Sequence, residues 1–474
     1  MRGQDDVVRH ERWVMLATLA LLQVVTIVTG FYAVDNDLTL SALTKQPPPA
    51  ETAPPEVPVV TAGPVLAGLA ARPGDGPLPS KGTLTRRLTD ALGDQALGSR
   101  VGAVVIDTST GERVFAHDPD TGITPASTTK VVTSVAALAS LGPDTRLATR
   151  VVQGATPGAI VLVGGGDPLL AGPKAKPTRY PAQASIATLA ARTAAALKRQ
   201  GTTRVTLSYD TSLYTGPDTG PGWKPGYIPD GHVAPVHALA IDEGRANPDQ
   251  NQPRVADPSR HAADAFAALL KKRGIKVAGP VKPGQAQAGA AELAKVESAP
   301  VYALVEHALT YSDNDLSEAL ARHVAIKEGQ PASFAGVARA IPQVLRRLGA
   351  GDGIQVYDGS GLSTRNRISA AAMAGLIALS TSPDQPALNT VASGMPVAGF
   401  SGTLGNGRRF VGPDSKDQVG LVRAKTGTLN NVNTLAGLTT SKDGRVLAFA
   451  FMADRVPVYA EPVLDRLAAI VARA

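Results

Sequence analysis

Three short motifs place residues capable of nucleophilic chemistry at three distant points of the chain. Ser127-Thr128-Thr129-Lys130, Ser312-Asp313-Asn314 and Lys425-Thr426-Gly427 each occur once. A serine hydroxyl becomes a useful nucleophile only when a base takes its proton. Residues three positions apart share one face of a helix. The first motif therefore predicts that Lys130 activates Ser127 for acyl transfer through a serine ester.

The other polar residues of the motifs fit supporting roles in the same reaction. Lys130 can accept a proton only when it is neutral, and burial or the like charge of Lys425 would lower its pKa. Ser312 could relay protons to a leaving amine, and Asn314 could hold a substrate amide. Asp313 is interpreted as structural.

The third motif is predicted to lie on a strand edge, where an extended peptide could add as a further strand. The charge of Lys425 and the hydroxyls of Thr426 and Thr428 suit a free carboxylate. Gly427 would let the substrate approach the backbone closely. The backbone N–H groups of Ser127 and Thr428 are the predicted oxyanion hole.

The segments around these motifs predict an α/β protein of the α+β type. Strands are predicted over 101–107 and 113–117, and a helix is predicted to begin near Ala126. Residues 421–454 have the pattern of three antiparallel strands, and 461–474 that of an amphipathic helix. Both ends of the folded region should therefore contribute to one antiparallel sheet with helices on its faces.

The chain divides into five predicted parts. Residues 1–34 are a cytoplasmic tail and a transmembrane helix, 35–82 a Pro/Ala-rich linker, 83–150 the first part of a catalytic domain, 151–250 an inserted smaller domain, and 251–474 the second catalytic part. The helix predicted over 258–274 is expected to return to the main domain. The proline content of the linker favours a semi-rigid spacer.

Residues 13–34 contain no charged side chain. Twenty-two helical residues span about 33 Å, which matches the core of a bilayer. Arg2, Arg9 and Arg12 precede the segment, so the positive-inside rule places the rest of the chain outside the cell membrane. The alternative interpretation is a signal peptide that is cleaved on secretion.

Composition excludes several other classes of protein. Hydrophobic residues make up 43% and charged residues 18%, a globular composition, and the absence of cysteine rules out disulfides and thiolate chemistry. The net charge of +7 suits an anionic surface, but aromatic residues are only 4% and no basic run contains them, so no nucleic-acid partner is expected. The histidines show no metal-ligand spacing, so no metal and no cofactor is expected.

Together the three motifs are typical of penicillin-binding proteins and class A β-lactamases. The chain resembles most the class C low-molecular-mass penicillin-binding proteins, the D-alanyl-D-alanine carboxypeptidase/endopeptidases. Further segments carry this resemblance over about residues 83–474: Leu162–Leu169, Asp210 with Tyr214, Gly222-Trp223, Asp358–Ser363, Ser401–Leu404 and Ala424–Thr428.

The resemblance implies a penicilloyl-serine-transferase fold and a serine peptidase. Ser127 would be the nucleophile and Lys130 the base, with Ser312, Asn314 and Lys425 assisting. The implied substrates are peptidoglycan stem peptides, and β-lactam antibiotics would be captured covalently. Asp210 could bind the cationic end of a diaminopimelate side chain, or it could simply form a turn.

The sequence departs from this family at two places. Lys130 and Ser312 are only 182 positions apart, so one of the family's two inserted domains should be reduced or missing. Residues 240–244 read Ala-Ile-Asp-Glu-Gly where the family usually carries an asparagine, which bears on substrate preference. A secreted β-lactamase and a catalytically inert wall-binding scaffold on the same fold are the alternative functions.

Overall fold

The structure is a computed structural model that describes residues 18–19, 21–23, 81–176, 180–405 and 407–474. Most of the predicted membrane span at 13–34 lies outside these residues, and so does the predicted linker up to residue 80. Within the described part of the chain, no helix has both the length and the apolar character needed to cross a membrane.

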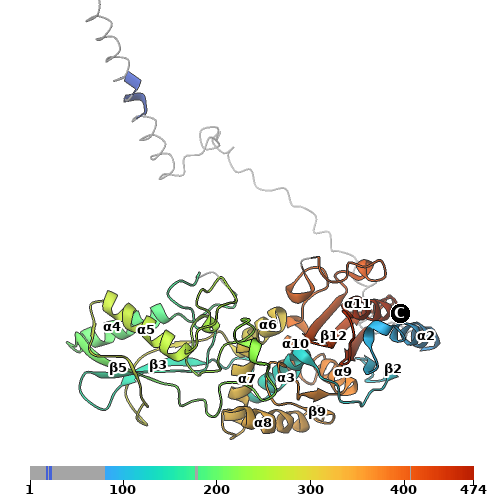
Figure 1. Cartoon of the computed structure of the whole chain (residues 1–474), viewed down its shortest axis with the longest axis horizontal. Coiled ribbons are helices and arrows are strands. Elements are labelled where there is room, and N and C mark those ends of the chain that lie inside the picture. The colour runs from blue at the N-terminus through green and yellow to red at the C-terminus, as the bar shows by residue number, and fades with distance from the viewer. Residues whose placement is uncertain (1–17, 20, 24–80, 177–179, 406) are drawn as a thin grey trace, which may run out of the picture. The chain divides into compact units, whose positions relative to one another are not determined.

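A five-stranded antiparallel sheet forms the centre of the main domain, with strand order β11-β12-β13-β1-β2 (Figure 1). The strands are β1 (Val101–Asp107), β2 (Arg113–His117), β11 (Val422–Leu429), β12 (Val432–Thr440) and β13 (Val446–Ala453). β1 pairs with β13 along its whole length, from Val101 opposite Ala453 to Asp107 opposite Leu447. The prediction that both ends of the folded region supply one antiparallel sheet is confirmed.

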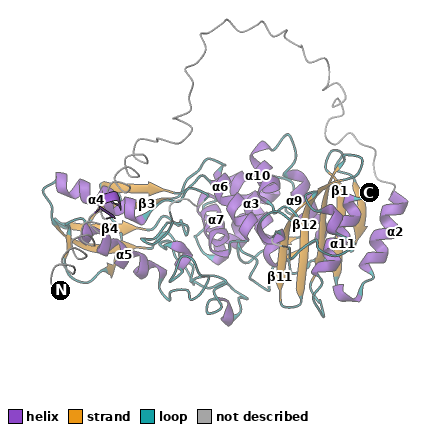
Figure 2. Ribbon diagram, turned by 90° about the horizontal axis from the view of Figure 1, so that it is seen from above, coloured by secondary structure: helices purple, strands orange, loops and turns teal. Residues whose placement is uncertain are grey.

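Helices cover both faces of this sheet, as the α+β prediction requires. One face belongs to a core that it shares with α3, α6, α7, α8 and α9, and the other packs on α2 and α11. Figure 2 shows α3 and α9 on one side of this sheet and α11 and α2 on the other. The helices are α2 (Lys81–Leu92), α3 (Thr129–Leu141), α6 (Val301–Tyr311), α7 (Asn314–Lys327), α8 (Phe334–Arg347), α9 (Ala370–Leu379), α10 (Asn389–Gly394) and α11 (Glu461–Ala472). The two faces of each strand alternate along its sequence, so β13 sends Phe449 and Phe451 to one core and Ala450 and Met452 to the other.

A second sheet belongs to the inserted region, and its strand order is β6-β5-β4-β3-β8. Its strands are β3 (Ala148–Gln153), β4 (Ala159–Val163), β5 (Arg204–Asp210), β6 (Lys276–Val277) and β8 (Glu292–Glu297), with the short β7 (Lys282–Pro283) beside β5. Helices α4 (Ile186–Arg199) and α5 (Pro258–Lys272) pack on it. A two-residue hairpin of β9 (Ile354–Gln355) and β10 (Arg367–Ile368) lies in the main domain.

The inserted sheet extends beyond the predicted boundaries of 151 and 250. β3 begins at Ala148 and pairs with β8, which ends at Glu297. The expectation that the helix at 258–274 returns to the main domain is wrong, because α5 buries Phe266 and Leu270 in the core of the insert. Its amphipathic pattern shows that one face is buried but does not show which sheet buries it.

Candidate active site

Ser127 and Lys130 lie at the start of α3, in the middle of the main domain. Ser127 sits in a single turn of 3₁₀-helix, η3 (Ala126–Thr128), and Lys130 follows in the first turn of α3. Lys130 Nζ lies 3.0 Å from Ser127 Oγ. Ser127 is half-buried, whereas the side chain of Lys130 is completely buried. The hydroxyl therefore contacts a lysine that could take its proton, and it remains open to a substrate.

Two further oxygen atoms surround the amine of Lys130. Asn314 Oδ1 and the carbonyl oxygen of Ser360 both lie 2.6 Å from Nζ. A neutral amine has two N–H donors and one lone pair. If the two N–H groups are donated to Asn314 and Ser360, the lone pair is left for the hydroxyl of Ser127. The arrangement thus suits a neutral lysine that acts as a base.

Burial lowers the pKa of Lys130 to about 8, because a charged amine loses its hydration inside the protein. The carboxylates of Asp358, Asp313 and Glu318 act in the opposite direction and limit the shift. A pKa near 8 leaves a substantial neutral fraction close to neutral pH, which a general base requires.

Ser312 and Lys425 form a second hydroxyl–amine pair. Lys425 Nζ donates to Ser312 Oγ at 2.9 Å and to the carbonyl of Thr426 at 2.8 Å. Lys425 is completely buried, and burial together with the nearby positive charge of Lys130 lowers its pKa well below the usual range. The expected influence of one lysine on the other is therefore present, and it acts on Lys425.

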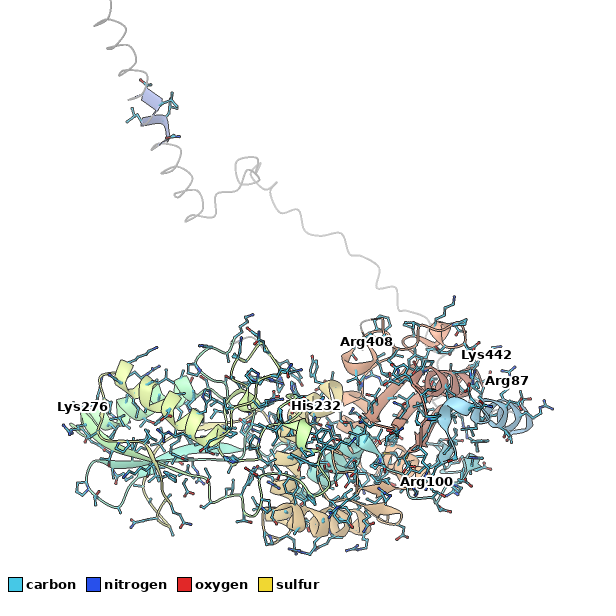
Figure 3. The ribbon with its side chains drawn as sticks, in the orientation of Figure 1. Arg87, Arg100, His232, Lys276, Arg408 and Lys442 are labelled. Carbon is cyan, nitrogen blue, oxygen red and sulfur yellow. The ribbon has the colours of Figure 1, made fainter. Side chains whose placement is uncertain are left out.

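Asn314 and Asp313 begin α7. Asn314 accepts from Lys130 and donates through Nδ2 to the carbonyl of His232 at 2.8 Å. His232 lies between the inserted sheet and the main sheet (Figure 3). Asp313 caps the helix, since its side chain accepts from the N–H of Leu316. Asn314 thus orients the amine of Lys130, a role that the sequence did not indicate.

The Lys-Thr-Gly motif lies on β11, which is an edge strand of the main sheet. The N–H of Ala424 donates to Pro396, and the carbonyl of Val422 accepts from Ala398, so these residues point their backbone groups away from β12. By the two-residue repeat of a strand, Thr426 and Thr428 point theirs outward as well. The predicted edge is therefore present, and its part beyond Ala424 faces Ser127.

Gly427 has a structural role in addition to the predicted one. A Cβ atom at this position would lie 2.2 Å from Thr434 Oγ1 and 2.6 Å from the carbonyl oxygen of Pro125. Such distances are far shorter than van der Waals contact. The missing side chain of Gly427 therefore lets β11 approach the turn that carries the nucleophile.

The two threonines of the third motif differ in how free their hydroxyls are. Thr426 Oγ1 lies 2.9 Å from Thr403 Oγ1, and either of the two can donate. Thr428 Oγ1 donates to Glu461 at 2.9 Å, so this proton is not available to a substrate carboxylate. The expectation that the hydroxyl of Thr428 binds a carboxylate is therefore not supported, although its backbone N–H points outward.

Asp210 does not join this cluster. It is the last residue of β5 in the inserted sheet, and it is buried. Its carboxylate accepts from the N–H of Ser212 and from the N–H of Ala286, both at 2.8 Å. Both oxygens are engaged by backbone, so the turn-forming interpretation fits this geometry better than a substrate contact does.

The segment Asp358–Ser363 supplies a part of the site that the motifs did not reveal. Asp358 is completely buried, and its carboxylate accepts from the N–H groups of Gly361 and Ser363 and from Nε1 of Trp223. Glu318 of α7 accepts from the N–H of Gly359 at 3.0 Å and from that of Ser360 at 2.8 Å. Two buried acids thus hold the loop whose Ser360 carbonyl binds Lys130.

Two functional turns contain non-glycine residues in the left-handed region. Ala126, directly before the nucleophile, has φ +50°, and Ser312 has φ +59°. Each such residue costs about 1–3 kcal/mol and persists only where the surroundings hold it. At Ala126 the support comes from the Asp358–Ser363 loop, because Gly361 packs so closely that a Cβ there would lie 1.9 Å from the carbonyl of Ala126.

The site as a whole has the parts needed for acyl transfer to a serine. Folding brings together Ser127, Lys130, Ser312, Asn314 and Lys425 from three separate segments. The nucleophile has an adjacent base, and the base is oriented by two further oxygens. An open strand edge beside it can bind an extended peptide.

Comparison with known proteins agrees with this chemistry. Residues 84–253 and 245–473 match the model of the D-Ala-D-Ala carboxypeptidase 3 (S13) family. Carboxypeptidase Rv3627c of Mycobacterium tuberculosis is 37% identical over 429 residues, covering 88% of this chain and 89% of that protein. Carboxypeptidase DacB of Mycolicibacterium smegmatis is 34% identical over 474 residues, covering 98% of each.

A solved structure shows the same fold. Penicillin binding protein 4 (dacB) from Haemophilus influenzae superposes with a TM-score of 0.66, covering 82% of this chain and 98% of that one, at 23% sequence identity. The antiparallel sheet with helices on both faces is therefore the expected penicilloyl-serine-transferase fold.

Proposed function

Because the chain belongs to the D-Ala-D-Ala carboxypeptidase 3 (S13) family, it is a serine-type D-Ala-D-Ala carboxypeptidase, and we propose that it removes the terminal D-alanine of peptidoglycan stem peptides through an ester on Ser127. The assignment of Ser127 as the nucleophile depends on one observation. Lys130 Nζ lies 3.0 Å from Ser127 Oγ, and two other oxygens occupy its remaining hydrogen-bonding positions.

In the acylation step, neutral Lys130 takes the proton of Ser127 as the oxygen attacks the carbonyl of the penultimate D-alanine. The N–H groups of Ser127 and Thr428 stabilise the oxyanion. Ser312 relays the proton that Lys130 has taken to the nitrogen of the leaving D-alanine, the C–N bond breaks, and Lys130 is left neutral again. Water then hydrolyses the ester, and Lys130 is the group placed to activate it.

Substrate binding follows from the charges and donors that line the strand edge. A buried lysine whose charged form is destabilised gains most from a bound anion, so Lys425 would bind the terminal carboxylate of the peptide. The amide of Asn314 has two N–H groups, and His232 uses one of them. The other can donate to a carbonyl of a peptide that lies along β11.

A fluorescent penicillin tests the proposed nucleophile, since β-lactams mimic the acyl-D-alanyl-D-alanine end and acylate the same serine. The unmodified chain should become labelled and release the label slowly, and Ser127→Ala should remain unlabelled. Rapid turnover of the drug would favour the β-lactamase alternative. Absence of labelling in a folded chain would favour the inert scaffold.

Two muropeptide substrates separate the two peptidase activities that this ester can serve. Release of free D-alanine from a monomeric pentapeptide measures carboxypeptidase activity. Conversion of a cross-linked dimer to monomers measures endopeptidase activity. We expect both activities to be absent in Ser127→Ala, because both pass through the same acyl enzyme.

We also propose that residues 13–34 anchor the protein in the cell membrane with its catalytic part outside. The support is the uncharged apolar run of twenty-two residues and the three arginines before it. The full chain should remain in the membrane fraction after an alkaline wash, and a variant lacking residues 1–34 should be soluble. Recovery of a shortened chain in the medium would instead indicate a cleaved signal peptide.

A further inference from the structure

A polar pocket of about 200 Å³ lies directly beside Ser312 and Asn314. It is lined by charged side chains from three segments, namely Glu243, Arg245, Arg254, His307, Asp313 and Asp315. The segments are far apart in the sequence, so no metal-ligand spacing marks them there. The proposed carboxypeptidase reaction uses none of these six side chains.

Three of these side chains can reach a common point. Single ligand atoms of Glu243, His307 and Asp313 all lie within 4.8 Å of one another. His307 Nε2 lies 3.5 Å from Asp313 Oδ2. This is longer than the 2.7–3.2 Å usual for an N–H···O hydrogen bond. It is close to the distance of about 3.4 Å that separates two ligands placed about 2.0–2.1 Å from a tetrahedral zinc ion.

One carboxylate oxygen of Asp313 is buried without a hydrogen bond. Asp313 is 8% exposed, and its Oδ1 accepts from the N–H of Leu316. Its Oδ2 is buried and has no hydrogen-bond partner among the described residues, and it lies 3.5 Å from His307 Nε2, a contact that is an ion pair only when the imidazole is protonated. An unpaired buried carboxylate oxygen is costly unless something binds it.

The charges of the pocket leave an acidic excess around this point. Arg254 lies 3.3 Å from Asp315 and also donates to the carbonyl of Glu243, so it is fully engaged. Arg245 pairs with Glu243, and Arg254 also lies 4.0 Å from a carboxylate oxygen of Glu243. The pocket thus contains three carboxyl groups and two guanidinium groups, one carboxyl more than its arginines can pair with.

We propose that Glu243, His307 and Asp313 bind a divalent transition-metal ion, and that water in the pocket completes its coordination. Two carboxylates and an imidazole suit zinc better than calcium, which prefers oxygen ligands alone. Asp313 is the residue between Ser312 and Asn314, so the ion would hold the turn that presents both to the active site. This site lies outside the proposed catalytic reaction and does not depend on it.

Arg245 competes with the metal for Glu243. Its side chain is 18% exposed, so the protein does not enclose it completely and it can turn away from Glu243 when a cation binds there. Removing its charge should therefore tighten metal binding, whereas removing a ligand should weaken it. Tighter binding without Arg245 and weaker binding without a ligand residue would distinguish a specific metal site from general attraction of cations to an acidic surface.

The test is isothermal titration calorimetry of the full chain with zinc, after dialysis against a chelator. We expect one zinc ion per chain, weaker binding by at least about tenfold in His307→Gln and Glu243→Gln, and tighter binding in Arg245→Gln. His117→Gln, which removes an exposed histidine of β2, should bind as the unmodified chain does. Calcium should not compete.

Two results would overturn the proposal: no zinc binding by the folded full chain, or equal affinity in His307→Gln and the unmodified chain. Circular dichroism and penicillin labelling establish that each variant is folded. If His307→Gln fails to fold, the zinc affinities of Glu243→Gln and Arg245→Gln test the proposal instead. Changes of the same sign in these two variants would also contradict the proposal.

Discussion

At the scale of single residues, the reactivity of Ser127 depends on the protonation of Lys130. The protonated amine cannot accept a proton, and burial brings the pKa of Lys130 down to about 8. The rate of acylation by a fluorescent penicillin should therefore rise with pH and level off above about pH 8. A rate that falls over this range, with the protein still folded, would contradict Lys130 as the base.

Asn314→Asp offers a second test of the same amine. The substitution puts a carboxylate where the amide oxygen now lies 2.6 Å from Lys130 Nζ. A negative charge this close stabilises the ammonium, so the pKa of Lys130 should rise by about 1–3 units. The pH profile of acylation should move to higher pH, and the rate near neutrality should fall.

Asn389→Asp is the matched control, because Asn389 is exposed at the start of α10. This variant makes the same amide-to-carboxylate change on the surface, and the pH profile of acylation should not move. An unmoved profile in folded Asn314→Asp would mean that another group controls acylation.

At the scale of elements, the fit between β11 and the η3 turn determines where the nucleophile sits. Gly427→Ala would place a methyl group 2.6 Å from the carbonyl of Pro125 and 2.2 Å from Thr434 Oγ1. Overpacking of this kind costs about 1–3 kcal/mol. We expect a lower free energy of unfolding in urea and slower acylation, because β11 must move away from the turn.

Gly375→Ala is the control for that substitution. Gly375 lies within α9, and a Cβ there would meet nothing within 4 Å. Alanine is favoured over glycine in a helix by up to about 1 kcal/mol. This variant should therefore be slightly more stable and equally active. If both variants gave the same stability, close packing would not be the reason for glycine at 427.

The loop that holds Lys130 depends in turn on α7. Glu318 is completely buried and accepts from the N–H groups of Gly359 and Ser360. Glu318→Ala leaves both N–H groups unpaired, which should cost about 2–4 kcal/mol in unfolding free energy and should slow acylation by displacing the Ser360 carbonyl.

Glu318→Gln separates the effect of losing the hydrogen-bond acceptor from the effect of losing the negative charge. Burial and the negative charge of Asp358 raise the pKa of Glu318 to about 7, so a neutral amide replaces a group that is itself partly neutral. Glutamine keeps an acceptor oxygen, so this variant should acylate at nearly the normal rate. Equal losses in the two variants would show that charge, rather than the hydrogen bonds, matters.

At the scale of the whole molecule, the sequence predicted the main sheet well and the insert less well. The strands at 101–107 and 113–117 and the three near the C-terminal end have the predicted bounds within a few residues, because alternating apolar patterns and turns mark them locally. The partner of α5 and the extent of the inserted sheet depend on pairing between distant segments, which no local pattern shows.

The same distinction holds for the site. Side chains that define the chemistry could be found from their motifs, and folding brings five of them together. The carbonyl of Ser360 could not be found in this way, because every residue has one. The hydrogen bond from Thr428 to Glu461 likewise depends on the contact between β11 and the first turn of α11, which no local pattern shows.

Among the residues that the structure describes, the hydrophobic cores are built from residue 84 onward. Both cores of the main sheet and the core of the insert consist of side chains between Leu84 and Ala472. Because buried apolar area is the dominant source of stability, a variant that begins at Lys81 should unfold at the same temperature as the full chain.

The same variant should react with a fluorescent penicillin at an unchanged rate, because the described groups that hydrogen-bond to Lys130, namely Ser127, Asn314 and Ser360, all lie on the retained segments. A variant that begins at Thr89 is the contrast. It removes Leu84 and Leu88 of α2, which pack on the sheet face shared with α11, and should be less stable by several kcal/mol. If the chain from Lys81 were as unstable as the shorter one, residues 1–80 would have to contribute to the fold itself.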